Sequence, residues 1–270
     1  MTQRLWFYPN QGWSSLCSAA AVFYCLQQDR PDLYRQIVLE LGNRGETCLG
    51  NKVIKPREGC CHPKEYFVSN NADVLKVSPI DWITLASLRD STGIFPYDSP
   101  DDQFSGITDA STVIKWFGYF GAARLNKPWK SPASSRDNNY GFIDNHDKLY
   151  KIVELNNYLS NGKYAGVLIN ASLLGSDSQS LVANHWIVIV KPISLANGDK
   201  INESSDLILI SSKEIKFECF SWGSVQDIPY FRNDYNINAR KNNKKTINIS
   251  PTLEQFMARF YDSLVFESIL

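Results

Sequence analysis

The chain has 270 residues, of which 43% are hydrophobic and 21% are charged, the usual composition of a globular protein. Because 28 basic side chains balance 28 acidic ones, neither a nucleic acid nor an anionic membrane is expected as a partner. No window reaches the ~18 apolar residues of a membrane span, and the N-terminal MTQRLWFYPN lacks the apolar stretch of a secretory signal. We expect one soluble domain over residues 1–270.

The cysteines argue for reduced thiols and against a metal site. There are six of them, Cys17, Cys25, Cys48, Cys60, Cys61 and Cys219. Their spacing is too irregular for a disulfide framework. Cys48, Cys60, Cys61 and His62 contain no C-x₂-C pair, and adjacent cysteines cannot easily point at one tetrahedral zinc ion. The acidic segment 98–103 lacks the spacing of a calcium loop. No metal or cofactor is predicted.

The first part of the chain is predicted to be mainly helical. Helical spacing of apolar residues recurs in five segments, which are 17–28, 31–42, 81–91, 109–121 and 147–160. Pro31 suits the first position of its helix and Gly42 its end, while Asp109 or Ser111 suits an N-cap. Turn-forming residues dominate the segments 51–80, 93–106 and 127–141, which are expected to be irregular.

The second part is predicted to be a sheet. Short runs of branched and aromatic residues, separated by polar turns, occur at 164–174, 185–193, 206–212 and 214–223. A chain whose helices come first and whose strands come second is typical of an α+β fold with an antiparallel sheet.

Cys17 stands at the first turn of the first predicted helix. Helix N-termini present unpaired N–H groups and a partial positive charge, which favour the thiolate form of a cysteine. Of the three histidines, His185 opens a predicted strand, where a sheet edge would hold its ring as a base. Gln11 and Gly12 form a turn ahead of Cys17, and the Gln11 amide and the Cys17 backbone N–H suit an oxyanion hole. These residues predict an acyl-transfer site.

The same residues resemble the papain-like cysteine peptidases. In that family a Gln-Gly pair and four further residues precede the catalytic cysteine at the head of a buried helix, as Gln11, Gly12 and Cys17 do here. The family histidine follows Asn or Asp at the start of a distant strand, as His185 follows Asn184. The resemblance implies a papain-like fold, with Cys17 as nucleophile, His185 as general base and acid, and Gln11 as the oxyanion donor.

The later Asn-Ser-Trp-Gly segment of the family is matched only in part. Ser221, Trp222 and Gly223 are present, but Phe220 occupies the place of the asparagine that orients the histidine. Trp222 matches the ring that shields the histidine from water in that family. The orienting role is left open among Ser221, Ser211, Ser212 and Asp206, and a bare Cys-His pair is a further alternative.

The segments between these motifs resemble papain-fold toxin domains that bacteria deliver by contact-dependent or type VI secretion. The resemblance rests on the residues 17–24, 30–34, 43–56 and 81–91. It implies an effector in interbacterial competition, made without a signal peptide in the cytoplasm of its producer and delivered into the cytoplasm of a target cell. Its partners would be a protein substrate and a cognate immunity protein that covers the cleft.

The alternatives use the same fold. A peptidoglycan amidase, a deamidase and a transglutaminase share this arrangement of cysteine and histidine. From another class of function, the chain could be a catalytically silent papain-fold module that binds a partner. Intact Gln11, Cys17 and His185 favour an enzyme. The leading expectation is a cysteine protease.

Overall fold

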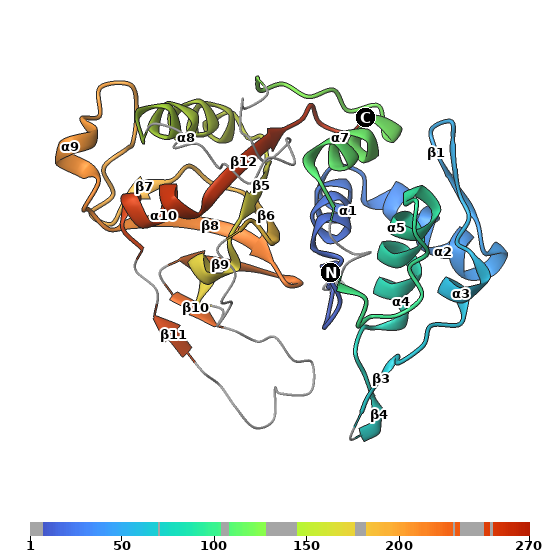
Figure 1. Cartoon of the computed structure of the whole chain (residues 1–270). Coiled ribbons are helices and arrows are strands. Elements are labelled where there is room, and N and C mark those ends of the chain that lie inside the picture. The colour runs from blue at the N-terminus through green and yellow to red at the C-terminus, as the bar shows by residue number, and fades with distance from the viewer. Residues whose placement is uncertain are drawn as a thin grey trace, which may run out of the picture.

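The computed structural model describes residues 8–69, 71–103, 108–127, 145–175, 182–228, 230–232, 246–248 and 251–270. Helices gather in one half of the molecule, and a sheet with its own helices forms the other half (Figure 1). The chain is therefore mixed helix and sheet, as the sequence predicts for an α+β protein. No helix in the described ranges is long and apolar enough to cross a membrane. The single domain over 1–270 stays a prediction.

The helical half contains α1, α2, a broken third helix and α7. Their bounds are α1 Cys17–Asp29, α2 Pro31–Arg44, α4 Pro79–Asp81, the π-helix η1 Trp82–Ala86, α5 Ser87–Thr92 and α7 Ala110–Tyr119. The predicted N-cap is confirmed, because Asp109 accepts a hydrogen bond from the Thr112 N–H. Gly42 as a helix end is wrong. α2 continues to Arg44, and Gly45 takes the left-handed capping conformation with φ of 70°.

The expectation of irregular structure over 51–80 is wrong in part. One hairpin pairs β1 Thr47–Leu49 with β2 Lys52–Ile54, a second pairs β3 Phe67–Val68 with β4 Asn71–Leu75, and α3 Glu58–Cys61 lies between them. Strands of two to five residues are too short for a periodicity to stand out among turn-forming neighbours.

The other half is built on a six-stranded sheet in the order β12-β5-β6-β8-β7, with β9 paired to β8. Its strands are β5 Ala165–Ile169, β6 His185–Ile189, β7 Ser194–Leu195, β8 Ile215–Ser221, β9 Ser224–Ile228 and β12 Phe260–Val265. Each described pairing in it is antiparallel. A small separate hairpin joins β10 Tyr230–Arg232 to β11 Thr246–Asn248.

Two predicted strand segments need correction. Residues 206–212 hold a short helix, α9 Leu207–Ile210, because the Asp206 carboxylate accepts a hydrogen bond from the Ile208 N–H at 2.9 Å. Ile208 is 82% exposed, so this apolar run has no sheet face to cover. The strand expected over 164–174 ends at Ile169, and a 3-10 turn, η3 Ala171–Leu174, follows it.

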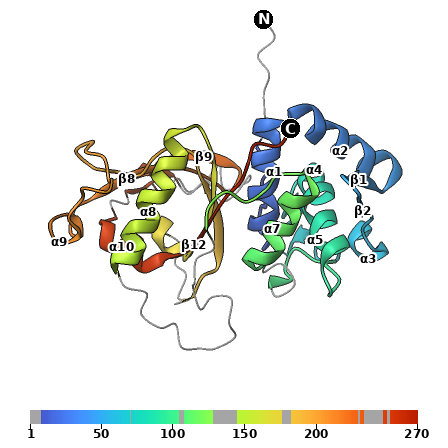
Figure 2. The ribbon, with the colours of Figure 1, turned by 90° about the horizontal axis from the view of Figure 1, so that it is seen from above.

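Strand alternation explains how the two halves meet. Trp186 and Val188 of β6 belong to the hydrophobic core around α1, whereas Ile187 and Ile189 belong to the core beneath α8 and α10. These helices, α8 Asn145–Ser160 and α10 Leu253–Arg259, lie together in the sheet half (Figure 2). One face of the sheet thus packs on α1 and the other on its own helices.

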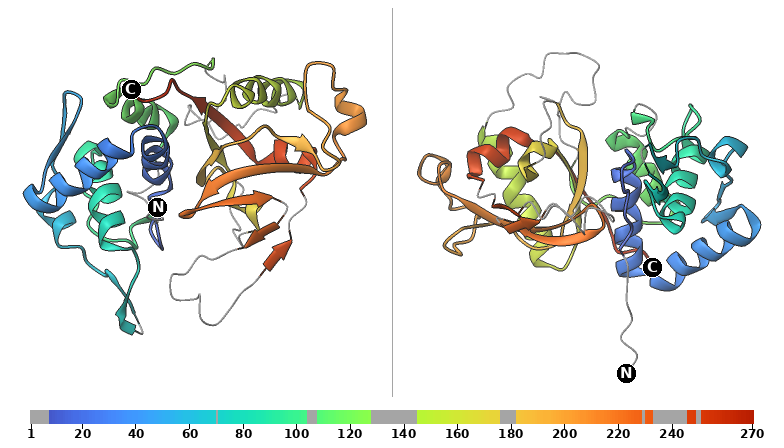
Figure 3. Two further views of the ribbon diagram at one scale, coloured as in Figure 1. Left: turned by 180° about the vertical axis from the view of Figure 1, so that it is seen from behind. Right: turned by 90° about the horizontal axis from the view of Figure 1, so that it is seen from below.

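The chain crosses back to the helical half at its end. After β12 it runs to a C-terminus beside α7 and α1 (Figures 1 and 3). The Ile269 N–H donates to the Asp29 carboxylate at 2.9 Å, which ties this segment to the end of α1. Phe266 stacks on Phe117 of α7 with ring centroids 3.8 Å apart.

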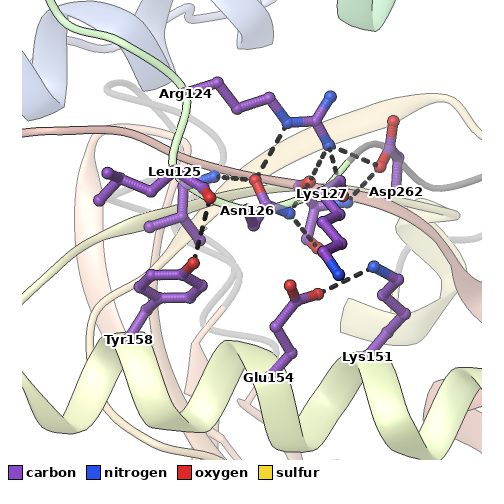
Figure 4. Close-up of polar contacts among 10 residues, drawn as sticks. Arg124, Leu125, Asn126, Lys127, Lys151, Glu154, Tyr158 and Asp262 are labelled. Atoms are coloured by element: carbon purple, nitrogen blue, oxygen red, sulfur yellow. Dashed lines mark hydrogen bonds and ion pairs between the residues drawn. The ribbon is translucent and has the colours of Figure 1, made fainter.

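Polar side chains hold the segment after α7, residues 124–127, against β12 (Figure 4). The Asn126 amide donates to the Ser263 carbonyl at 2.8 Å and accepts from the Val265 N–H at 2.9 Å. Arg124 donates to Asn126 Oδ1 at 3.1 Å and forms a 3.8 Å ion pair with Asp262. Burial raises the pKa of Asp262 to about 6, although the charge of Arg124 opposes the shift. Asn126 is thus the central member of this contact.

Replacing Asn126 with Ala should lower the free energy of unfolding by about 1–3 kcal/mol, because the buried Val265 N–H loses its acceptor and the Ser263 carbonyl keeps only its bond from Arg124. Chemical denaturation followed by circular dichroism measures this loss. The matched control is Asn161→Ala, which removes an exposed amide that donates to the Asn157 carbonyl and should change stability by less than about 0.5 kcal/mol. Equal losses in both variants would contradict a bridging role for Asn126.

Candidate active site

Cys17 is the first residue of α1, as the sequence predicts, and it is a partly exposed free thiol. Burial raises the pKa of this thiol above its ordinary value, while the backbone N–H groups of Trp186, Ser18 and Cys17 itself lower it. The loss of hydration outweighs the helix terminus, so the expectation of a resting thiolate is wrong. The contribution of Trp186 also shows that the thiol lies against the beginning of β6.

Gln11 lies in a tight turn ahead of Cys17. Gly12 has φ of +56°, and a Cβ atom there would lie 2.2 Å from the Lys76 carbonyl, so only glycine fits. The Gln11 side chain is 7% exposed, and its Oε1 has no hydrogen-bond partner among the described residues. The unpaired Oε1 is an acceptor and could bind only a donor of a bound group, whereas an oxyanion would need the Nε2 donor of the same amide.

His185 is the first residue of β6 and pairs with Ile169 of β5. Its side chain is 4% exposed, and its Nε2 lies 2.8 Å from Ser221 Oγ. Burial lowers the pKa of His185 to about 3, so its ring is neutral at pH 7. The Asn184 side chain accepts a hydrogen bond from the Ala171 N–H at 2.8 Å, which fixes the loop before β6.

The structure distinguishes the candidates for the orienting role. Ser221, at the end of β8, contacts the His185 ring directly. Asp206 caps α9, and Ser211 follows the last residue of that helix, with Ser212 next in the chain. Of the four residues named from the sequence, Ser221 is therefore the one with a hydrogen bond to His185.

Trp222 covers His185. The two rings stack with centroids 4.6 Å apart and an angle of 21° between their planes. Trp222 has φ of 47°, which is uncommon for a bulky residue and costs about 1–3 kcal/mol. Gly223 follows with φ of 82°, and a Cβ atom there would lie 2.6 Å from the Asn10 side chain. This turn after β8 therefore lies directly on the loop that leads to Cys17.

Asn10 is a residue of the site that the sequence analysis missed. Its Oδ1 accepts a hydrogen bond from the Gly12 N–H at 2.9 Å, an Asx turn that shapes the Gln11–Gly12 bend. Asn two positions before Gly is the signal that could have found it. Its backbone N–H donates to Asp81 at 2.9 Å, a contact across 71 positions that no local pattern indicates.

The metal-site candidates remain apart in the structure. Cys60 is buried and Cys61 is exposed, so these neighbours on α3 face different surroundings. In the acidic segment, Asp98 pairs with Lys64 at 2.8 Å and Asp101 with Lys76 at 2.5 Å. Within the described ranges, no three His, Cys, Asp or Glu side chains converge as metal ligands do.

The site thus combines a neutral thiol, a neutral imidazole and the buried amide of Gln11. A neutral imidazole can accept the proton that a thiol must lose before it attacks a carbonyl carbon. Comparisons with known proteins add no assignment: the chain matches no family model, no curated protein and no solved structure.

We expect His185 to stay neutral from pH 8 down to about pH 4 in the folded protein, because burial lowers its pKa to about 3. ¹⁵N NMR of the imidazole ring measures this directly. The unfolded chain binds the proton near pH 6.5, so His185 should lower the free energy of unfolding as the pH falls from about 6.5 to 3. His185→Gln should remove that part of the pH dependence. A ring that titrates near pH 6.5 in the folded protein would contradict this assignment.

Proposed function

We propose that the chain is a papain-like cysteine protease that cleaves a protein through an acyl-enzyme on Cys17. The observation that carries the proposal is the proximity of the Cys17 thiol to the backbone N–H of Trp186, the residue directly after His185. Because His185 Nε2 contacts Ser221, Nδ1 is the ring nitrogen that remains for the thiol. This division of the two nitrogens is the one that a cysteine–histidine pair requires.

The reaction begins with proton transfer. His185 Nδ1 takes the proton from Cys17 as Sγ forms a bond to the carbonyl carbon of the substrate. The Gln11 amide and the Cys17 backbone N–H hold the oxyanion. The imidazolium then protonates the leaving amine as the C–N bond breaks. In the second half His185 removes a proton from water, the resulting hydroxide attacks the thioester, and the proton returns to Cys17.

Ser221 and Trp222 support the histidine in this mechanism. With Nε2–H donating to Ser221 Oγ, the imidazole is held in the tautomer whose Nδ1 accepts a proton. A hydroxyl is neutral, so it stabilises the imidazolium less than a carboxylate does. The stacked Trp222 ring keeps water from His185, which strengthens the local electrostatic interactions.

Charge favours a protein as substrate over peptidoglycan. The formal net charge is zero, so the chain has no electrostatic attraction to the anionic cell wall. In the toxin interpretation the substrate lies in the cytoplasm of a target bacterium, and a cognate immunity protein protects the producer. A peptidoglycan amidase is the outcome of the test below that would replace the protease.

Cys17→Ala and His185→Ala should each abolish activity without unfolding the chain, because each removes one member of the reacting pair. Gln11→Ala should retain a small part of the activity, since one oxyanion donor contributes a factor of ~10²–10³ in rate. Toxicity on expression in a bacterium, with circular dichroism of each variant, measures both. Cys61→Ala is the matched control, since it removes an exposed thiol and should remain fully toxic. A fully toxic Cys17→Ala would favour the silent binding module.

A second experiment identifies the substrate class. The wild-type chain is expressed in the bacterial cytoplasm and, separately, with an export signal that directs it to the cell wall. We expect toxicity in the cytoplasm, with new protein fragments seen by mass spectrometry that are absent for Cys17→Ala. Lysis only on export, with cleaved cell-wall peptides, would replace the protease with an amidase.

A further inference from the structure

The candidate active site is divided between the two halves of the molecule, and Asn10 touches both. On the helical side its Oδ1 shapes the Gln11–Gly12 bend, and its backbone N–H donates to the Asp81 carboxylate. On the sheet side its side chain fills the space beside Gly223, where a Cβ atom would lie 2.6 Å away. A displacement of Asn10 would therefore move the turns that carry Gln11 and Trp222 together.

Asp81 is the anchor of Asn10. It ends α4, is 9% exposed, and accepts from the Asn10 N–H at 2.9 Å through Oδ1 and from the Ser78 hydroxyl at 2.6 Å through Oδ2. The contact with Asn10 is charge-assisted, and such hydrogen bonds are about twice as strong as neutral ones. Trp13 and Ser15 hold the later part of the loop through Lys76 and Asp102, so the buried carboxylate of Asp81 positions its beginning, at Asn10.

Among the described residues, the titratable groups around Asp81 do not mask its titration. Burial raises the pKa of Asp81 to about 6, while Ser78 and Asn10 lower it. The titratable groups that face it are Tyr34 of α2 and Tyr66 of the segment before β3. Burial and the charge of Asp81 raise the pKa of both phenols, that of Tyr66 to about 12. Neither phenol changes its charge between pH 4 and pH 8.

We propose that Asp81 is a positioning residue of the candidate active site, which holds Asn10, and through it the Gln11 and Trp222 turns, in the working arrangement only while its carboxylate is ionised. This rests on the proposed function for its catalytic consequence, but the contact between Asp81 and Asn10 is testable by itself. A protonated carboxyl loses its charge and offers fewer acceptor sites, so the Asn10 N–H is held less strongly. Acid therefore loosens the site.

Stability should move in the opposite direction. The folded protein binds this proton near pH 6, whereas the unfolded chain binds it near pH 3.9. Asp81 alone therefore raises the free energy of unfolding as the pH falls from about 6 to 4. A residue with a merely structural role would lose activity and stability together, so opposite signs distinguish positioning from folding.

The test uses the full-length chain and two probes of Cys17. p-Nitrophenyl acetate acetylates Cys17 with help from the oxyanion donors, and iodoacetamide alkylates it without them. Intact-mass spectrometry gives the rates of acetylation and of alkylation. Because both reactions use the thiolate, the fraction of thiolate cancels in the ratio of the two rates. With a pKa of about 6, only about one-tenth of the Asp81 side chains are ionised at pH 5. We therefore expect the ratio of the acetylation rate to the alkylation rate to fall about tenfold from pH 7 to pH 5.

Substitutions assign this fall to Asp81. Asp81→Asn does not titrate and, like the protonated carboxyl, offers the Asn10 N–H only a neutral acceptor, so its ratio should be about tenfold low and independent of pH. Asp81→Ala should be about tenfold low at all pH values. Asp262→Asn is the matched control, because Asp262 is a second buried carboxyl whose pKa is raised to about 6 but which lies at β12. Its variant should keep the fall of the wild type.

Amide hydrogen exchange at Asn10, corrected for the intrinsic effect of pH, tests the contact without any catalysis. Protection should be lost from pH 7 to pH 5 in the wild type and should already be low at pH 7 in Asp81→Asn. Unchanged protection in the wild type, or an acid fall of the ratio that persists in Asp81→Asn or vanishes in Asp262→Asn, would overturn the proposal. Lost protection without any acetylation of Cys17 at pH 7 would instead support the role of Asp81 and contradict the proposed function.

Discussion

The burial of α1 is the constraint on which the rest of the structure depends. Every residue from Ser18 to Gln27 is buried, and the helix contacts α2, α7 and η1 of its own half as well as β6 and β8 of the sheet. A helix that is apolar on all sides is fully buried only when both halves of the molecule pack against it. That closure brings the first residue of the helix, Cys17, to the first residues of β6. The packing of the core around α1 therefore also assembles the candidate active site.

Sequence reasoning succeeded where a residue and its local pattern belong together. Cys17 begins a helix because a polar turn meets an apolar run, and His185 begins a strand because a branched run follows it. Prediction from the sequence failed where contacts with residues distant in the chain determine the structure. The apolar run 206–212 is a strand by composition, but a short cap and an exposed position make it helical. Asp81 could not be linked to Asn10, because 71 positions separate them. Whether Cys17 is charged also depends on packing that no local rule supplies.

Burial, more than any specific charge, determines the electrostatics of the site. It raises the pKa of Cys17 and lowers that of His185, so both changes favour the uncharged pair. An uncharged pair of this kind differs from a preformed thiolate–imidazolium pair, because the proton is on the thiol and not on the imidazole. The contact of His185 with the neutral hydroxyl of Ser221 is consistent with this lower polarity. A thiol kept in this state is also slow to react with oxidants, since oxidation proceeds through the thiolate.

The hydrogen bond from Ile269 to Asp29 has a consequence for the order in which the protein matures. It joins positions 240 apart, so the end of α1 can acquire this contact only after the residues up to Ile269 have been synthesised. Phe266, which stacks on α7, arrives equally late. An emerging chain therefore carries Cys17 long before the surroundings of this thiol are complete. During translation the producing cell would hold only an unfinished form.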